Sequence, residues 1–201
     1  DLLETADDAL GKLANLVTDL LDVSRLQSGV LGVSVMSVDP AEVIMPALDE
    51  LSLGPADVEI DLGADVPEMV ADPALLQRVV VNLLSNALRY EPAGGRVRLA
   101  TSSFADRVEI RVIDHGPGIP EDRRDDVMVP FQRLGDADST VGLGLGLALS
   151  KGFVEGMDGT LALEDTPGGG LTMVISLPRV GHQAAGHDGV DHDDIEEGSV
   201  R

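Results

Sequence analysis

The segment from Asp72 to Tyr90 constrains the fold more than any other part of the sequence. Asp72 is a favoured helix-capping residue, and Pro73 after it is well tolerated at the first helical position. Apolar residues then recur at three- and four-residue spacing and would form one face: Leu76, Val80, Leu83, Leu84 and Ala87. The sequence therefore predicts a helix over Pro73–Tyr90 with one continuous apolar face.

A polar stripe lies on another face of this predicted helix. It contains Arg78, Asn82, Asn86, Arg89 and Tyr90, which follow one another at helical spacing. Asparagine is not favoured inside helices, so two of them one turn apart suggest amide oxygens directed at a common ligand. A neutral amide oxygen suits a magnesium ion that carries phosphate charge, and arginine suits the phosphates. The alternative is a polar stripe that faces solvent.

Two glycine-rich segments also suggest contacts with a ligand. In Asp114–Pro120 a predicted strand leads into an acid and two glycines, which let the backbone approach a flat ligand. An aspartate at a strand end can accept a hydrogen bond from an exocyclic amine such as that of adenine. In Gly142–Leu147 glycine and leucine alternate at the start of a predicted helix, where free backbone N–H groups can face phosphates. A tight turn and a flexible hinge are the respective alternatives.

The rest of the chain alternates between helical and strand patterns. Helices are predicted over Pro40–Leu53 and Leu143–Met157, and strands over Val33–Val38, Val58–Leu62, Arg96–Thr101, Arg107–Ile113, Thr160–Leu163 and Leu171–Leu177. The segment 114–142 has few periodic apolar positions, which is typical of a functional or mobile loop. Within it we expect Asp122–Val141 to form a lid.

The two ends of the chain differ from its middle. The first 29 residues predict a long helix with a wide apolar stripe that ends at Gly29. This stripe packs either on the rest of the domain or on helices outside this chain, and we favour the second. From Gly181 the chain is acidic and almost without apolar residues, so we expect disorder there. The expected division is therefore 1–29, 30–180 and 181–201.

Composition excludes several classes of function. The chain has 36 acidic and 14 basic residues and a formal net charge of −22, which argues against binding to nucleic acids or anionic membranes. It contains no cysteine, which excludes disulfides and thiolate zinc sites. No apolar run approaches the roughly 18 residues of a membrane span.

Taken together, the motifs resemble those of sensor histidine kinases. Asn82–Tyr90 is similar to the N box of that family, Asp114–Ile119 to the G1 box, Pro130–Arg133 to the F box and Gly142–Leu147 to the G2 box. Gly168–Pro178 resembles the closing strand pair, and Leu16–Gly29 resembles the second helix of the dimerisation and phosphotransfer hairpin. Within the family, Arg133–Asp136 and Glu164–Leu177 most resemble the KdpD potassium and turgor sensors.

The resemblance implies an α+β two-layer sandwich of the Bergerat (GHKL) type. A mixed β-sheet would carry helices on one face, preceded by one long dimerisation-type helix. ATP and Mg²⁺ would bind, with Asn86 holding the metal, Asp114 binding the adenine amine, and Asn82 and Arg133 as catalytic residues. The other ATP-binding residues that the resemblance implies are Arg89, Tyr90, Gly116, Gly118, Ile119, Gly142, Gly144, Leu145, Gly146, Leu147 and Thr172. Asn82 would also contact the nucleotide, and Thr172 would support Asp114.

The phosphoacceptor of the family is a histidine that an acid follows on a hairpin helix. Here His115 lies in the glycine-rich segment, and His187 and His192 precede acids in the polar tail. The resemblance therefore implies a protein-histidine kinase whose phosphoacceptor lies outside this chain, so we expect no autophosphorylation of the chain alone. It also implies a homodimer in the intact kinase, a response-regulator partner, and a cytoplasmic location in a membrane-associated bacterial sensor.

Two other functions stay open on the sequence. An ATP hydrolase of the same fold, as in gyrase or Hsp90, would place a glutamate one turn before the metal-binding asparagine. That position is Asn82 here, and an amide cannot act as a general base. An ATP-gated interaction module would instead use the leading helix for dimerisation, without catalysis.

Overall fold

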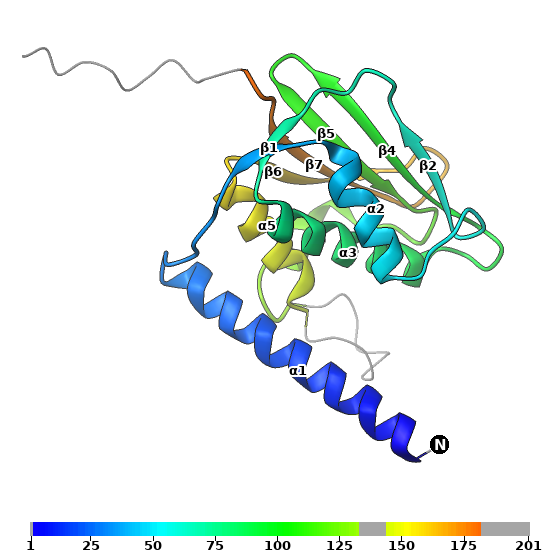
Figure 1. Ribbon diagram of the computed structural model, residues 1–201. Coiled ribbons are helices and arrows are strands. Elements are labelled where there is room, and N and C mark those ends of the chain that lie inside the picture. The colour runs from blue at the N-terminus through cyan, green and yellow to red at the C-terminus, as the bar shows by residue number, and fades with distance from the viewer. Residues whose placement is uncertain (1, 133–143, 182–201) are drawn as a thin grey trace, which may run out of the picture.

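The computed structural model describes residues 2–132 and 144–181, and a five-stranded sheet lies at its centre. The strands follow the order β2-β4-β5-β7-β6 and comprise β2 (Val58–Leu62), β4 (Val97–Phe104), β5 (Arg107–Ile113), β6 (Thr160–Asp165) and β7 (Leu171–Pro178). β2 and β4 are parallel, whereas the other neighbours are antiparallel, so the sheet is mixed. Helices α2 (Pro40–Glu50), α3 (Pro73–Tyr90) and α5 (Gly146–Gly156) cover one face (Figure 1). The predicted two-layer sandwich is confirmed.

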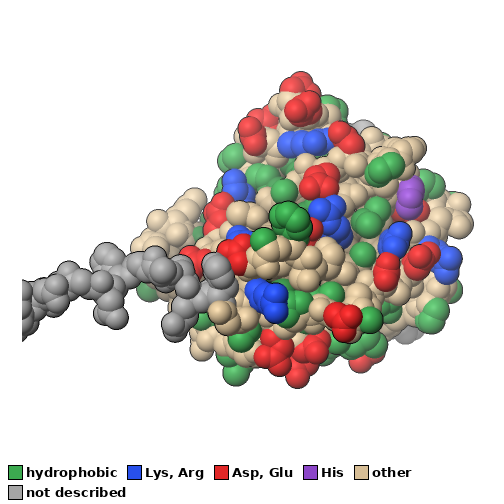
Figure 2. Space-filling model, turned by 90° about the horizontal axis from the view of Figure 1, so that it is seen from above, with side chains coloured by type: hydrophobic (Ala, Val, Ile, Leu, Met, Phe, Trp, Pro, Cys, Tyr) green, Lys and Arg blue, Asp and Glu red, His purple; other side chains and the backbone are tan. Residues whose placement is uncertain are grey.

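The alternation of buried and half-buried residues along the strands decides which face of the sheet the helices cover. In β5, Val108, Ile110 and Val112 are buried, whereas the residues between them are half-buried on the other side. That second face carries ion pairs between neighbouring strands, such as Arg98 with Asp61. Figure 2 views the molecule from the side on which the sheet lies in Figure 1, and there acidic and basic side chains are interspersed.

Helix α3 begins and packs as its sequence predicts. The carboxylate of Asp72 accepts hydrogen bonds from the backbone N–H groups of Ala74 (3.1 Å) and Leu75 (3.2 Å). The predicted apolar face is fully buried against the sheet and the neighbouring helices: Leu76, Val80, Leu83, Leu84 and Ala87 are all 0% exposed. The opposite stripe is thereby fixed on the outer side of the core.

Three short elements were not expected from the sequence. β3 (Met69–Ala71) pairs antiparallel with β1 (Met36–Val38) in a separate two-stranded sheet, and β1 is shorter than the predicted strand 33–38. A 3₁₀ turn, η1 (Glu121–Arg123), overlaps the start of the segment expected to be the lid, and α4 (Arg124–Val127) lies within it. Of that lid the structure describes 122–132, and 133–141 lie outside the described residues.

Helix α1 (Leu2–Gln27) ends as predicted at Gly29, whose φ is +67°. The N–H of Gly29 donates to Leu26 O (3.1 Å) and that of Val30 to Arg25 O (3.0 Å), which is the Schellman arrangement. Figure 1 shows that α1 runs past the domain and extends beyond it. Among the described residues, no helix combines the length and the apolar character that crossing a bilayer needs.

The apolar stripe of α1 divides into two parts. Near the C-terminal end, Val23 is 7% exposed and Leu26 packs on Gly152 of α5. Farther toward the N-terminus the stripe is exposed, at Leu10, Leu13, Val17, Leu20 and Leu21. One end of the stripe therefore packs on this domain, and packing of the exposed part on helices outside this chain stays a prediction.

Candidate nucleotide-binding site

The polar stripe of α3 contacts different elements along its length. Arg78, near the start of the helix, forms ion pairs with Asp19 and Asp22 of α1 and does not face the glycine-rich segments. One turn later, Asn82 Nδ2 donates to Ser150 Oγ of α5 at 2.9 Å. Gly146 lies directly against this amide, because a Cβ at Gly146 would stand 2.3 Å from Asn82 Oδ1. The first turn of α5 therefore abuts the middle of α3.

The C-terminal part of the stripe is open. Asn86 is half-buried, Arg89 is exposed and Tyr90 is 55% exposed. None of these side chains forms a hydrogen bond or ion pair with another residue in the described part of the chain. Their amide oxygen, guanidinium and phenol are therefore available to a ligand.

Asp114 follows the last residue of β5 and is 3% exposed. Its Oδ1 accepts hydrogen bonds from the N–H groups of Gly116 (2.9 Å) and Leu171 (3.1 Å). Burial raises the pKa of the Asp114 carboxyl, and the charge of Glu91 adds to this, whereas the two backbone N–H groups oppose it. Among residues 2–132 and 144–181 both printed hydrogen bonds to this carboxylate go to Oδ1, so Oδ2 is an acceptor without a partner there.

The loop after Asp114 lies close to two other backbone segments. A Cβ at Gly116 would stand 2.5 Å from Tyr90 O, at the end of α3. Gly118 has a φ of +69°, and a Cβ there would stand 3.0 Å from Gly170 O. Ile119 is half-buried and packs against the core. Glycine is thus required where this loop crosses α3, and again where it meets the turn before β7.

Thr172 lies on β7 opposite Ile113, next to Asp114, but its hydroxyl has another partner. Thr172 Oγ1 is 2.9 Å from Thr166 Oγ1, and both threonines are buried. The expected direct support of Asp114 by Thr172 is not observed in the described structure. The backbone N–H of the preceding residue, Leu171, supports the Asp114 carboxylate instead.

The segment before α5 lies at the same end of α3. Gly144 has a φ of +70°, and its carbonyl accepts the N–H of Phe131 at 3.1 Å. Leu145 is 2% exposed and Leu147 packs against the core, which leaves the backbone to face outward. Among the described residues, no side chain caps the first turn of α5. Gly142 and Arg133 lie outside the described residues, so their roles remain predictions.

The chemistry of these groups fits Mg²⁺–ATP. No cluster of three or more His, Cys, Asp or Glu able to hold a metal occurs in the described ranges. Mg²⁺ in nucleotide sites commonly takes few protein oxygens and completes its shell with phosphates and water, so one amide oxygen such as that of Asn86 suffices. The backbone N–H groups at the start of α5 and the guanidinium of Arg89 suit phosphates, and Asp114 Oδ2 suits an amine.

Comparison with known proteins identifies the family of the chain. Residues 71–181 match the model of the family described as histidine kinase-, DNA gyrase B-, and HSP90-like ATPase. The fold matches the mycobacterial sensor histidine kinase MprB with a TM-score of 0.62 and 32% identity, over 73% of this chain and 98% of that one. The chain belongs to this family, as the ATP-binding catalytic portion of a sensor histidine kinase.

Two further proteins show which sensor kinases this chain is similar to. The sensor protein KdpD of Rathayibacter rathayi is 66% identical over 166 residues, which are 83% of this chain and 19% of that protein. The likeness to KdpD inferred from the sequence is thus confirmed, and the chain spans about a fifth of this relative's length. Full-length ShkA in complex with AMPPNP has a TM-score of 0.72 and 26% identity, over 86% of this chain and 37% of that one.

The sequence analysis missed two residues whose side chains bond to the segments around the candidate site. Arg124 of α4 donates to Ile119 O (3.2 Å) and Leu163 O (3.3 Å), and it pairs with Asp165 of β6. Glu91 accepts the backbone N–H of His115 at 2.8 Å. Both side chains act across long stretches of sequence, so no local pattern could have indicated them.

Proposed function

We propose that the chain binds one Mg²⁺–ATP at the C-terminal half of α3 and holds it for phosphoryl transfer to a histidine outside residues 1–201. The observation that carries this proposal is the convergence of three elements on that half-helix. Asn82 abuts the start of α5. Tyr90 abuts the loop of residues 114–120, called the glycine loop below, and Asp114 lies where this loop begins. The complex of the related ShkA with AMPPNP supports a nucleoside triphosphate as the ligand.

In the proposed site, each available group has one task. Asp114 Oδ2 accepts the adenine amine, because Oδ1 is already used by two backbone N–H groups. The Asn86 amide oxygen binds Mg²⁺, and Arg89 neutralises phosphate charge. Gly144 and Gly146 let the backbone at the start of α5 approach the phosphates. ATP supplies the phosphoryl group, and the contribution of the chain is positioning and electrostatics.

The chemistry of the Asn82 side chain favours transfer to a histidine over hydrolysis. Its amide donates to Ser150 and offers no basic group that could take a proton from water. The hydrolases of this fold place a glutamate at this position to activate water. We therefore expect slow ATP hydrolysis and no acid-labile phosphate on the chain alone after incubation with radiolabelled ATP. Acid-labile label on this chain would contradict the proposal.

The proposal extends to a homodimer and a response regulator in the intact kinase. The exposed part of the α1 stripe supports it, since Leu13 is 56% exposed and Leu21 is 54% exposed. Exposed apolar residues in such a row are typical of a helix that pairs with other helices. Membership of the sensor histidine kinases implies a response regulator as the partner of the intact protein.

Titration calorimetry with ADP, with and without Mg²⁺, tests the site. Asn86→Ala should weaken Mg²⁺-dependent binding about tenfold, by loss of one ligand, and leave the Mg²⁺-free affinity unchanged. Gln77→Ala on the same helix is the control, because in the described part of the chain the Gln77 side chain bonds only to the exposed Glu50 side chain.

Asp114→Asn should change the preference for the base. The amide oxygen keeps the bonds to Gly116 and Leu171, which turns an NH₂ donor toward the ligand in place of Oδ2. Adenine presents an amine at this position and should bind at least about tenfold more weakly. Guanine presents a carbonyl there and should bind more tightly than to the wild type. Unchanged affinity in both the Asn86 and the Asp114 variants would refute the site.

A further inference from the structure

Glu91 is a nearly buried carboxylate in an unfavourable position. It is the C-terminal cap of α3, and its backbone N–H still donates to Ala87 O at 2.9 Å. Its side chain is 7% exposed. The C-terminal end of a helix disfavours negative charge, and burial of a carboxylate is costly unless donors satisfy it. A specific interaction must therefore compensate for this placement.

The compensation comes from His115, in the glycine loop. Glu91 Oε2 accepts the backbone N–H of His115 at 2.8 Å, and Oε1 lies 3.5 Å from His115 Nδ1. The turn after α3 folds over the carboxylate, since a Cβ at Gly95 would stand 2.1 Å from Oε1. Among the described residues, no other side chain joins the end of α3 to this loop by a hydrogen bond.

Two carboxylates thus hold consecutive backbone N–H groups of the loop. Glu91 takes that of His115, and Asp114 Oδ1 takes that of Gly116. The two acids are close enough that the charge of Glu91 raises the pKa of Asp114, in addition to the effect of burial. The same loop backbone passes Tyr90 O at a distance that admits only glycine. Glu91 therefore fixes the spacing between the end of α3 and the end of β5.

We infer that Glu91 is a positioning residue for the adenine end of the site. By clamping His115 to the end of α3, it orients the Asp114 carboxylate so that Oδ2 faces the base, while α3 presents Asn86 and Arg89 to the phosphates. This inference rests on the proposed function, because it assigns Asp114 to the adenine amine. Glu91 itself acts through the loop and does not contact the nucleotide.

Nucleotide binding by three variants tests this assignment. Glu91→Ala removes the acceptor, Glu91→Gln keeps an amide oxygen in its place, and Gly95→Ala displaces the carboxylate sterically. Affinities for ADP and for inorganic tripolyphosphate, both with Mg²⁺, are measured by calorimetry on the full chain, with thermal unfolding as a check on folding. Glu59→Ala, with a side chain 52% exposed on β2, is the matched control.

Glu91→Ala and Gly95→Ala should weaken ADP about tenfold, which corresponds to about 1.4 kcal/mol, and leave tripolyphosphate unchanged. Glu91→Gln should stay within about threefold of the wild type, because the hydrogen bond persists. Combining Glu91→Ala with Asp114→Asn should add little to the loss from Asp114→Asn alone, since both act on the same contact.

Other outcomes separate the two claims. Absence of ADP binding by the wild-type chain would overturn the proposed function itself. If the wild type binds ADP and Glu91→Ala does so equally well, the positioning role is wrong and the nucleotide site stands. An equal loss of ADP and tripolyphosphate affinity, or a Glu91→Gln variant as weak as Glu91→Ala, would also refute the positioning role.

Discussion

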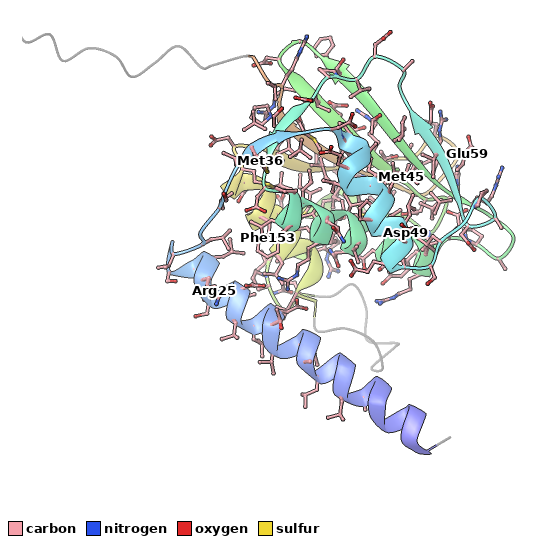
Figure 3. The ribbon with its side chains drawn as sticks, in the orientation of Figure 1. Arg25, Met36, Met45, Asp49, Glu59 and Phe153 are labelled. Atoms are coloured by element: carbon pink, nitrogen blue, oxygen red, sulfur yellow. The ribbon has the colours of Figure 1, made fainter. Side chains whose placement is uncertain are left out.

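Replacement of Arg78 by alanine should detach α1 from the ATP-binding domain. Arg78 Nη2 lies 2.6 Å from Asp19 Oδ1, and Nη1 pairs with Asp22, which is 5% exposed. The guanidinium carbon lies 5.3 Å from the centre of the Phe153 ring on α5. Figure 3 shows Phe153 on the side of the domain that faces α1. One side chain therefore links α1, α3 and α5.

The free-energy cost of Arg78→Ala follows from the burial of each partner of Arg78. Asp19 is 30% exposed and Arg78 35% exposed, so their pair belongs near the exposed limit of about 1 kcal/mol. Asp22 would be left nearly buried, and an unsatisfied charged group costs about 1.5–3 kcal/mol. Loss of the contact with Phe153 adds about 0.5–1 kcal/mol. Arg25, 3.4 Å from Asp22, offsets part of this, so we expect about 2–4 kcal/mol.

The contact depends on the positive charge of Arg78, and Arg78 keeps this charge at the pH values at which the protein is handled. Burial lowers the pKa of Arg78, but hydrogen bonds and charge from Asp22 and Asp19 outweigh this and raise it above its ordinary value. Stability from a raised basic pKa is present below the unfolded value and lost only as the pH rises through the folded one. The guanidinium therefore stays charged wherever the protein is handled. Arg78→Lys keeps the charge but cannot bridge both aspartates, so it should have an intermediate effect.

Hydrogen exchange of residues 19–27 is the assay. A loss of 2–4 kcal/mol of docking corresponds to exchange faster by about 30- to 1,000-fold, at one decade per 1.4 kcal/mol, with an upper limit set by the helicity of detached α1. Amides of β5 and α3 should be unchanged. Arg96→Ala is the control, since its pair with Glu59 spans 3.6 Å and both side chains are 52% exposed. Equal protection of 19–27 in the wild type and Arg78→Ala would refute the reasoning.

Three further predictions concern the glycines and the buried acid. Gly170→Ala should lower the free energy of unfolding by at least about 2 kcal/mol in chemical denaturation, because φ is +115° and the Cβ would stand 2.0 Å from Asp114 O. Gly168→Ala, with φ +95° but open space, should cost only about 1 kcal/mol, and equal costs would contradict the steric argument. Gly152→Val should detach α1 without unfolding the domain, since even a Cβ there stands 2.6 Å from Leu26 Cδ1, and exchange of 19–27 would show it. Because burial raises the pKa of Asp114, the native state holds that proton more tightly, so this group lowers stability as the pH rises through the unfolded and then the folded pKa. Asp114→Asn should therefore match or exceed wild-type thermal stability at neutral pH and lose that advantage in acid, and a less stable variant at neutral pH would contradict this.

The sequence predicts best those elements whose signals are local. The aspartate–proline starts at Asp39 and Asp72 and the apolar face of α3 are properties of a few neighbouring residues, and the structure matches them. β3 (Met69–Ala71) was missed because three residues carry no measurable period, and only its pairing with β1 makes it a strand. The strand predicted at 33–38 shortened to Met36–Val38 because pairing exists only where β3 lies opposite.

The candidate site shows the same limit at the level of side chains. The helical wheel correctly groups Arg78 with Asn82 and Asn86, but it cannot say what lies opposite each of them. Arg78 faces α1, which is 56 residues away from it along the chain at Asp22. Glu91 bonds to a residue 24 positions later, so its role depends on how β4 and β5 return the chain to α3.

Different parts of α3 contact different elements, which explains why this one helix positions so much of the domain. Its inner face is uniformly apolar and fixes it on the sheet, so its outer stripe keeps a constant position relative to the strands. Arg78 and Glu91 are thirteen residues apart, or about 20 Å at 1.5 Å per residue. One end of the stripe holds α1, the middle holds the first turn of α5 through Asn82, and the other end holds the glycine loop through Glu91. Because a helix is stiff over this length, a shift of α3 against the sheet moves both the α1 contact and the residues proposed to bind the nucleotide.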